Sequence, residues 1–560
     1  MVNVKNLFGM AVMATALVSC SSSDDLATDG KGNENKAEAA YASFKINLPT
    51  VSGTRAVDPN TGTEFDGGTA DEYAVKNGTI LIFDNTGNFV ESAELGTMNP
   101  WTTVNSNGVT TAAIATVQLN KVTVGSNNYK ALVLLNNDVD ATNKKVTLPT
   151  AADTYTDWSK DALKVNVANY EKTDYIFMAN APMYTGTSTE PTTLVDVKNI
   201  CASREEAQAK AATTVYVERG LAKVTMDDFT TGGYTVGEGT YKDAKVTINK
   251  WQLDVTNKST FPVHQIGGLS TDYLGIWSKE RFYDGTNPTF KRVYWGKDPN
   301  YSDYATLQNL AACKTAFNMI TKVEGDAGKA HPQYCLENTF DLANMMQGQT
   351  TRVVFKATFV PNGFTGAATF YKIGNNTAIW TEDNLKKQIK TVALTAMEIT
   401  DATEQAKYDV DLSKGTNISG KAGQHLIQEA NITYSGTPAA SKLTPAIVTE
   451  INTKLGLSAT TGISTYLNGE AYYIARIKHF NELTPWTAGT AYGTDNAAYL
   501  GRYGVLRNNW YSLSVSTVSG LGYPVIPEVK PTVPDDENDQ YINVEVKILD
   551  WAKRTQDINL

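Results

Sequence analysis

The chain has 560 residues, which is too long for a single hydrophobic core, so two or more domains are expected. Its formal net charge of −10 argues against nucleic acid as a partner, because such binding needs clustered Lys and Arg. Only 19% of the residues are charged, whereas Gly and Tyr number 42 and 28, a composition typical of β-sandwiches with short polar turns.

The N-terminal residues have the pattern of a secretory signal. Lys5 precedes an apolar run at 7–18 that is too short to span a bilayer. The run ends in the sequence LVSC, which resembles a bacterial lipobox in which Cys20 would be lipidated and become the first mature residue. Residues 1–19 are therefore expected to be a signal peptide and residues 20–40 a polar lipoprotein tether. The alternative is an ordinary signal peptide with a chance cysteine.

A strand with one apolar face is predicted directly after this tether. Period-two alternation places Ala42, Phe44, Ile46 and Leu48 on the same side. The strand is followed by the sequence Gly-Thr-Arg-Ala, which offers Arg55 and Ala56 to an arginine-specific protease. Cleavage there would release residues 41–55, the strand together with its loop.

Short runs of β-type residues separated by polar loops fill the body of the chain. They lie at 79–83, 129–135, 175–178, 215–219, 245–248, 251–255, 351–357, 471–477 and 510–515. Helical periodicity is best at 205–212 and 445–455, both expected as excursions between strands. A Gly-rich stretch around Gly232 is the best domain boundary. It divides an N-terminal sandwich at 56–230 from a larger one at 231–523.

The last predicted strand repeats the pattern of the first. Residues 541–560 follow a proline-rich tether at 524–540, and their apolar face is formed by Ile542, Val544, Val546 and Ile548. A strand with one apolar face must pair along an open sheet edge and bury that face. One removable strand and one tethered strand therefore indicate subunits that exchange strands. The alternative is a monomer in which both end strands complete their own sandwiches.

The sequence predicts no catalytic, cofactor or metal site and therefore no enzyme. Gly415 to Lys421 has the spacing of a phosphate-binding loop, but Ala422 stands where a hydroxyl would hold magnesium. The histidines are dispersed without the spacing of metal ligands; they are His264, His331, His425 and His479.

Two further features leave alternatives open. Cys313 and Cys335 could form a disulfide, but a sequence does not give the distance between them. Trp380, Trp486 and Trp510 could stack on sugars, although aromatic residues of sandwiches more often belong to the core.

With these segments in view, the chain resembles the fimbrillins of Bacteroidales, the subunits of type V pili, and within them the shaft subunit of the short, minor fimbriae. The resemblance is most specific near the C-terminus, where RNNWY at 507–511 precedes a strand and the tether, and VEV at 544–546 leads to LDW at 549–551. Asp550 stands where the family has proline. Weaker matches lie at 134–137 and 217–224. The inserts at about 265–345 and 375–465 match nothing.

The resemblance implies an all-β fold of two Greek-key (transthyretin-like) β-sandwich domains with small helical inserts. It also implies export to the outer membrane as a lipoprotein, cleavage after Arg55 by an arginine-specific protease, and a donor strand from another subunit that fills the opened groove. The membrane would be contacted only through the N-terminal lipid before cleavage.

The implied partners are other copies of the chain in a head-to-tail polymer, accessory tip or anchor subunits and the protease, with no cofactor. The receptor stays open. A tip or anchor adhesin and a glycan-binding surface lipoprotein are the alternative functions, and a secreted hydrolase has no site to support it.

Overall fold

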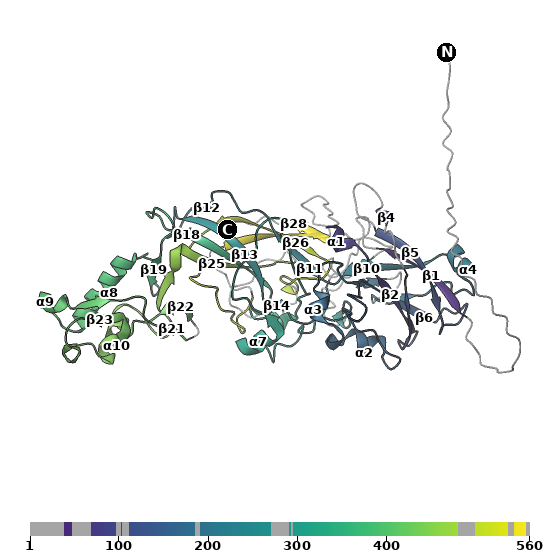
Figure 1. The fold of residues 1–560 in the computed structure, drawn as a ribbon, viewed down its shortest axis with the longest axis horizontal. Coiled ribbons are helices and arrows are strands. Elements are labelled where there is room, and N and C mark those ends of the chain that lie inside the picture. The colour runs from purple at the N-terminus through teal and green to yellow at the C-terminus, as the bar shows by residue number, and fades with distance from the viewer. Residues whose placement is uncertain are drawn as a thin grey trace, which may run out of the picture. The chain divides into compact units, whose positions relative to one another are not determined.

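The computed structural model describes residues 39–47, 69–96, 102–103, 111–184, 191–269, 291–292, 295–419, 421–479, 499–535, 542–550 and 552–555. From residue 39 onward the chain forms one compact unit. Strands dominate it and most helices are short, so the predicted all-β fold class is confirmed (Figure 1). No helix in the described part of the chain is both long and apolar enough to cross a membrane.

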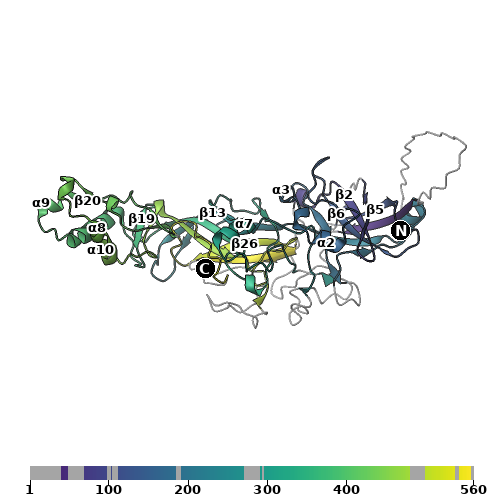
Figure 2. The same ribbon diagram turned by 90° about the horizontal axis from the view of Figure 1, so that it is seen from below.

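A nine-stranded sheet forms the first sandwich. Its strands are β1 (Ala40–Asn47), β2 (Gly78–Asp84), β3 (Phe89–Glu94), β4 (Thr102–Thr103), β5 (Thr111–Leu119), β6 (Tyr129–Leu135), β7 (Met178–Asn180), β9 (Val195–Asp196) and β10 (Thr213–Arg219). They are ordered β3-β2-β6-β7-β10-β1-β5-β4, with β9 paired to β6. Because β10 pairs first with β1 and then with β7, it carries the sheet from one layer to the other. β1 and β5 lie near β2 and β6 (Figure 2). Side chains of these four strands belong to one hydrophobic core.

Two sheets form the second sandwich. One contains β17 (Gln333–Cys335), β11 (Ala222–Met226), β26 (Trp510–Val518), β27 (Ile542–Asp550) and β28 (Ala552–Thr555) in that order. The other contains β12 (Tyr234–Thr235), β13 (Lys245–Asp254), β18 (Arg352–Val360) and β25 (Glu470–Arg476). Val224 and Leu513 of the first sheet share one buried cluster with Trp251, Phe355 and Tyr473 of the second, so the two sheets face each other.

Most predicted strands are confirmed in place. β6 spans the predicted residues 129–135, and β10 covers the predicted 215–219. The two runs predicted at 245–248 and 251–255 form one strand, β13, with a bulge between Ile248 and Lys250. The strand predicted at 175–178 is wrong except for its last residue. Tyr175 has a φ of 69°, in the left-handed region that a strand cannot contain, and β7 begins only at Met178.

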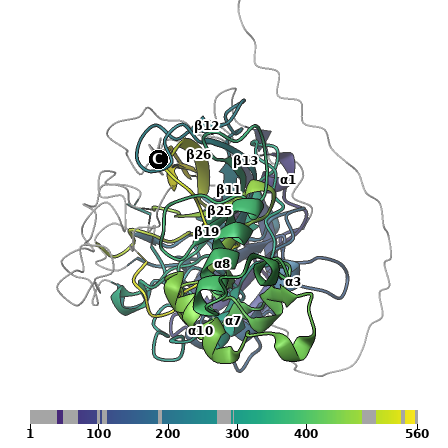
Figure 3. The same ribbon diagram turned by 90° about the vertical axis from the view of Figure 1, so that its left-hand side faces the viewer.

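A separate lobe is inserted between β18 and β25, which pair with each other. This insertion lobe, residues 370–466, contains β19 (Phe370–Ile373), α8 (Glu382–Ala396), α9 (Ala402–Gln405), β20 (Tyr408–Val410), β21 (Asn417–Ile418), β22 (Lys421–His425), β23 (Ile432–Tyr434), α10 (Pro445–Lys454) and β24 (Ile463–Tyr466). It has a hydrophobic core of its own, to which α8, α10 and the lobe's strands contribute. α8 and α10 lie side by side (Figure 3).

The sequence predicted α10 but missed α8, the longest described helix. Thr381 caps α8 by accepting a hydrogen bond from the backbone N–H of Asn384. Leu385, Ile389 and Ala393 follow at intervals of four residues and are buried. This periodicity was present in the sequence, but it lies in an insert whose partners were unknown.

The remaining helices in the described part of the chain are short. They are α1 (Ala70–Tyr73), α2 (Tyr155–Ser159), α3 (Val167–Tyr170), α4 (Arg204–Ala209) and α7 (Leu310–Ala316), with 3-10 turns at Ala162–Lys164, Leu342–Asn344, Glu429–Asn431, Pro438–Ala440 and Leu467–Gly469. α4 confirms the helix predicted at 205–212, although it begins and ends earlier. Two further pairs of short strands are β8 (Met183–Tyr184) with β15 (Lys291–Arg292) and β14 (Thr256–Asn257) with β16 (Phe317–Asn318).

The chain passes from the first sandwich to the second between Arg219 and Ala222. A Cβ added at Gly220 would lie 2.0 Å from the Tyr170 hydroxyl, so only glycine fits this crossing. Beside it, the Lys223 ammonium lies 2.6 Å from the Glu72 carboxylate and 3.7 Å from the centre of the Trp510 ring. Both charged side chains are buried, so this ion pair holds α1 of the first sandwich against the second.

Candidate functional site: the β1 groove and the C-terminal strand

The predicted removable strand, β1, is a central strand of the first sandwich. It runs antiparallel to β5, from Ala40 opposite Leu119 to Asn47 opposite Ala112. Its second half also runs parallel to β10, from Phe44 opposite Thr213 onward. Because both backbone edges of this half are paired, loss of β1 would leave unpaired groups on β5 and on β10 at once.

The inward face of β1 is completely buried. Ala40, Ala42, Phe44 and Ile46 are each 0% exposed and belong to the core of the first sandwich. Burial of Phe44 and Ile46 alone contributes about 3–6 kcal/mol, before ordering costs. Ala42, Phe44 and Ile46 therefore share one buried face, as the alternation predicts.

The outer face of β1 is covered as well, which the sequence did not predict. The Ser43 hydroxyl donates to the carbonyl of Ala207 in α4 at 2.7 Å and lies 2.8 Å from the Thr116 hydroxyl on β5. The Arg204 guanidinium lies 5.6 Å from the centre of the Tyr41 ring. Only Lys45 of β1 is exposed. The groove around β1 therefore has a floor of apolar side chains and a partial lid formed by α4.

The processing residues predicted from the sequence cannot be placed in this geometry. Cys20, Leu48, Arg55 and Ala56 all lie outside the described residues. The described strand ends at Asn47, eight residues before Arg55 in the sequence.

The C-terminal strand pairs within its own chain. β27 runs antiparallel to β26, from Leu513 opposite Val546 to Val518 opposite Ile542. β28 then pairs with both strands. This is the arrangement expected for a monomer that completes its own sandwich. The side chains of Ile542, Val544, Val546 and Ile548 lie outside what the structure describes, and their backbone is not brought near β1.

The tether before this strand is not free. Residues 524–535 lie against the second sandwich, with Val529 only 6% exposed and Asp535 fully buried. Proline removes a backbone donor but leaves the carbonyl, and the Pro527 carbonyl accepts a hydrogen bond from Arg352 at 2.7 Å. The proline-rich composition predicted a tether, and it did not show that residues 524–535 are docked on the second sandwich.

The other candidate sites from the sequence are accounted for structurally. Cys201, Cys313 and Cys335 are buried free thiols, so the possible disulfide does not form. Burial raises the pKa of Cys313 to about 11 and that of Cys335 to about 12, which keeps both thiols protonated. In the described ranges, no group of three or more His, Cys, Asp or Glu residues could hold a metal ion. His264 instead contacts Glu218 at 2.8 Å.

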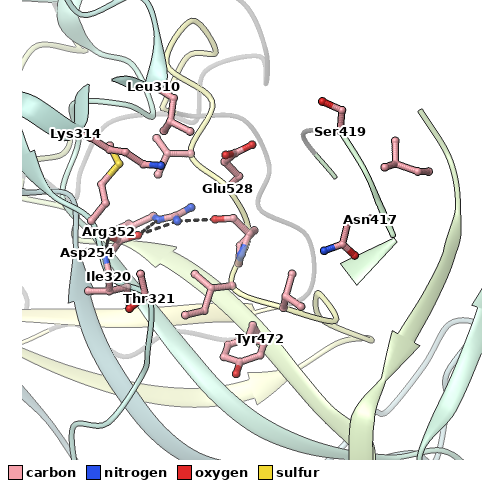
Figure 4. A pocket seen from close by; sticks show the side chains of 16 residues that line it. Asp254, Leu310, Lys314, Ile320, Thr321, Arg352, Asn417, Ser419, Tyr472 and Glu528 are labelled. Atoms are coloured by element: carbon pink, nitrogen blue, oxygen red, sulfur yellow. Dashed lines mark hydrogen bonds and ion pairs between the residues drawn. The ribbon is translucent and has the colours of Figure 1, made fainter. Parts of the chain in front are cut away.

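The remaining motifs are structural. Gly415 to Lys421 leads into the antiparallel pair β21–β22 and not into a helix, so it is no phosphate-binding loop. Trp510 is buried, Trp380 is half-buried, and Trp486 lies outside the described residues. A cavity of about 700 Å³ lies between β21 of the insertion lobe, α7 and residues 525–529, with Arg352 and Tyr472 among its lining side chains (Figure 4). Asp254 also lines this cavity, where its carboxylate is paired with the Arg352 guanidinium at 2.8 Å.

Comparison with protein families gives one match. Residues 464–557 match the family described as "Major fimbrial subunit protein type IV, Fimbrillin, C-terminal". This segment contains β25, β26, β27 and β28. No curated protein matches the chain in sequence.

Several solved structures are similar over most of the chain, although weakly. A fimbrilin from Porphyromonas gingivalis is 11% identical, covering 93% of this chain and 99% of its own, with a TM-score of 0.33. A proposed cell adhesion protein from Parabacteroides distasonis is 12% identical, with coverages of 93% and 99% and a TM-score of 0.37. A tip fimbrial protein from Porphyromonas gingivalis is 10% identical, with coverages of 92% and 100% and a TM-score of 0.26.

These TM-scores are all below 0.5, so the family match over residues 464–557 is the similarity that bears on function. It does not decide between the subunits of major and of minor fimbriae. The fimbrillin resemblance read from the sequence is thereby confirmed over residues 464–557, the segment that includes the self-paired C-terminal strand.

Proposed function

We propose that the chain is a structural shaft subunit of a cell-surface fimbria, not an enzyme. In this proposal it is exported as an outer-membrane lipoprotein through Cys20, cut after Arg55 by an arginine-specific protease, and polymerised by donor-strand exchange in support of adhesion. The observation that carries the proposal is the position of β1, buried between β5 and β10 and followed by the Gly-Thr-Arg-Ala sequence. The fimbrillin family match supports the more general role of a fimbrial subunit.

Removal of β1 would create a binding site with a defined shape. The groove would expose Val117, Val133 and Val215, together with unpaired backbone on β5 and β10. It would accept an extended segment with alternating apolar residues. The segment 542–548 has this alternation, and a neighbouring copy can supply it only if β27 leaves β26. Other copies of the chain are therefore the main partners, with accessory tip or anchor subunits at the fimbrial ends.

The test is the variant Arg55→Ala. It should fold with β1 in place and remain monomeric, whereas the unaltered subunit should assemble and begin at Ala56. Intact mass and N-terminal sequencing detect the cleavage. Ladders of oligomer bands, seen in mild detergent without boiling, detect assembly. Lys45→Ala is the matched control, because it removes an exposed charge from the same strand and should assemble normally. Fibres of the Arg55→Ala variant that retain residues 20–55 would overturn the proposal.

A further inference from the structure

We propose that residues 524–535 are a permanent anchor: they stay docked between the insertion lobe and the second sandwich while the strand beyond Asp535 is passed to a neighbouring subunit. This anchor segment gives the insertion lobe a role in assembly. The inference rests on the proposed function, and its test separates the two.

The middle of the anchor segment is held by a buried arginine. The Arg352 guanidinium pairs with the Asp254 carboxylate at 2.8 Å and donates to the Pro527 carbonyl at 2.7 Å (Figure 4). Both charged side chains are only 2% exposed. If the anchor segment left, the Arg352 N–H that donates to the Pro527 carbonyl would lose its acceptor. An unpaired donor on a buried cation is costly in a low-dielectric site. Because Arg352 is already fixed by Asp254, it is a preformed attachment point.

The start of the anchor segment is enclosed on two sides. Tyr523 exchanges backbone hydrogen bonds with Tyr472 of β25 at 2.7 and 2.8 Å. On the other side, a Cβ added at Gly423 of β22 would lie 2.9 Å from the Val525 side chain and 3.2 Å from that of Pro524. The backbone of the lobe therefore touches the segment directly, and the lobe and β25 form the two walls of a slot.

The end of the anchor segment is built into the second sandwich. The backbone N–H of Gln347 donates to the Val533 carbonyl at 2.9 Å, and that of Asp535 donates to the Met345 carbonyl at 3.1 Å. The Thr350 hydroxyl donates to the Asp535 carboxylate at 2.9 Å. Between these points Val529 packs in a buried cluster with Val255, Leu307, Cys313 and Phe317. Contacts thus continue from Tyr523 to Asp535.

A docked anchor limits where the donated strand can go. From Asp535 to Ile542 an extended chain reaches at most about 25 Å, whereas release back to Tyr523 would allow about 65 Å. A short connection from a fixed point raises the effective concentration of the strand near one neighbouring groove and excludes distant ones. The anchor would therefore set the subunit spacing along the polymer, while β27 is the part that moves.

A native cysteine allows the anchor to be locked. A Cβ added at Gly348 would lie 2.8 Å from the Pro531 Cα and 2.9 Å from the Cys313 Sγ, so these two residues are neighbours. In Pro531→Cys, mild oxidation at alkaline pH should form a disulfide with Cys313, which intact mass under non-reducing conditions would confirm. Pro531→Cys combined with Cys313→Ser cannot lock and is the matched control under the same oxidant.

The oxidised Pro531→Cys subunit, once cut after Arg55, should form ladders within about twofold of its reduced form. Failure only of the locked form would overturn the anchor and leave strand exchange intact. If the unlocked forms and the unaltered subunit also fail to assemble, the proposed function itself is wrong. Hydrogen exchange on the unaltered protein gives an independent result. Residues 524–535 should be equally protected in monomers and fibres, and loss of protection in fibres would contradict the anchor.

Discussion

Asp298 is a buried carboxyl group with an altered pKa. Removal from water raises its pKa from 3.8 to about 7, against the opposing effect of its hydrogen bonds. Its carboxylate accepts from the Asn257 amide and the Thr339 backbone N–H, each at 2.7 Å, and from the Asn300 backbone N–H at 2.6 Å. Since the group is fully buried, its titration is linked to folding.

This linkage predicts a direction for stability against pH. Between about pH 4 and pH 7 the folded protein keeps a proton on Asp298 that the unfolded chain has released. The free energy of unfolding should therefore fall as pH rises through this window, by at most about 1.4 kcal/mol per pH unit from this group. The contribution is fully present below the unfolded pKa and lost above the folded one.

Asp298→Asn is the comparison that isolates this contribution. The asparagine side chain lacks one oxygen acceptor, so the free energy of unfolding of the variant should be lower. It also has no proton that titrates. The difference in urea unfolding midpoint between the unaltered protein and the variant should change between pH 4.5 and pH 7.5. A difference that stays constant over this range would show that Asp298 titrates normally.

A second buried group of charges lies where the two sandwiches meet. The Arg507 guanidinium contacts the Glu337 carboxylate at 3.1 Å and donates to the Thr260 hydroxyl at the same distance. Burial by itself lowers the pKa of Arg507, but the charge of Glu337 and other nearby groups outweigh burial, so the pKa is raised on balance. These residues come from distant parts of the chain, so their pairing fixes loops that the sequence left unassigned.

At the scale of the secondary-structure element, β1 and β27 share the alternation of apolar and polar residues but lie in different sheets. β1 is a central strand covered by α4, whereas β27 lies between β26 and β28 in the other sandwich. Strand exchange would require β27 to give up its own pairing and to replace that of β1. The apolar face of β27, and not its polar face, should decide whether this exchange is favourable.

Two double variants test this expectation. Val544→Asp with Val546→Asp would bring two charges into a dry groove, at several kcal/mol per junction, and ladders should be lost. Glu545→Ser with Lys547→Ser alters the opposite face and should leave ladders nearly unchanged. Mixtures of cleaved subunits, analysed in mild detergent without boiling, give the readout. Equal ladders for both pairs would mean that β27 is not the donor.

At the scale of the whole molecule, the fold is completed by segments that return over long distances in sequence. Residues 524–535 cover Val255 and Cys313, and Pro527 engages Arg352. Loss of residues 524–535 together with the C-terminal strand should therefore destabilise the fold more than loss of the C-terminal strand alone.

A matched pair of truncations should separate these roles. A chain that ends at Asp535 keeps the anchor, and a chain that ends at Gly522 loses it. The shorter chain should be less stable by roughly 3–6 kcal/mol, because it loses the burial of Val529 and the acceptor of Arg352. Thermal unfolding of the two chains measures the difference, and neither should donate a strand. Equal midpoints would show that the anchor contributes nothing to the fold.

The sequence by itself determined the features that depend on local periodicity. Runs of β-type residues identified β6, β10 and β26. Alternation identified β1, because side chains on a strand alternate between its two faces whatever the strand pairs with. The same pattern gave the all-β class and the inward face of Phe44 and Ile46. Spacing also showed that Gly415 to Lys421 and the dispersed histidines lack the neighbours that their chemistry would need.

Only the tertiary structure decided which elements meet. β1, at residues 40–47, lies between strands at 112–119 and 213–216, and α4 covers it from elsewhere in the chain. The insertion lobe touches the anchor segment through Gly423, about 100 residues before Val525 in the sequence. Such pairings depend on burial shared between distant segments. The local propensity of a segment does not specify which distant segment it pairs with. For this reason the sequence predicted a tether, and the fold made it an anchored part of the second sandwich.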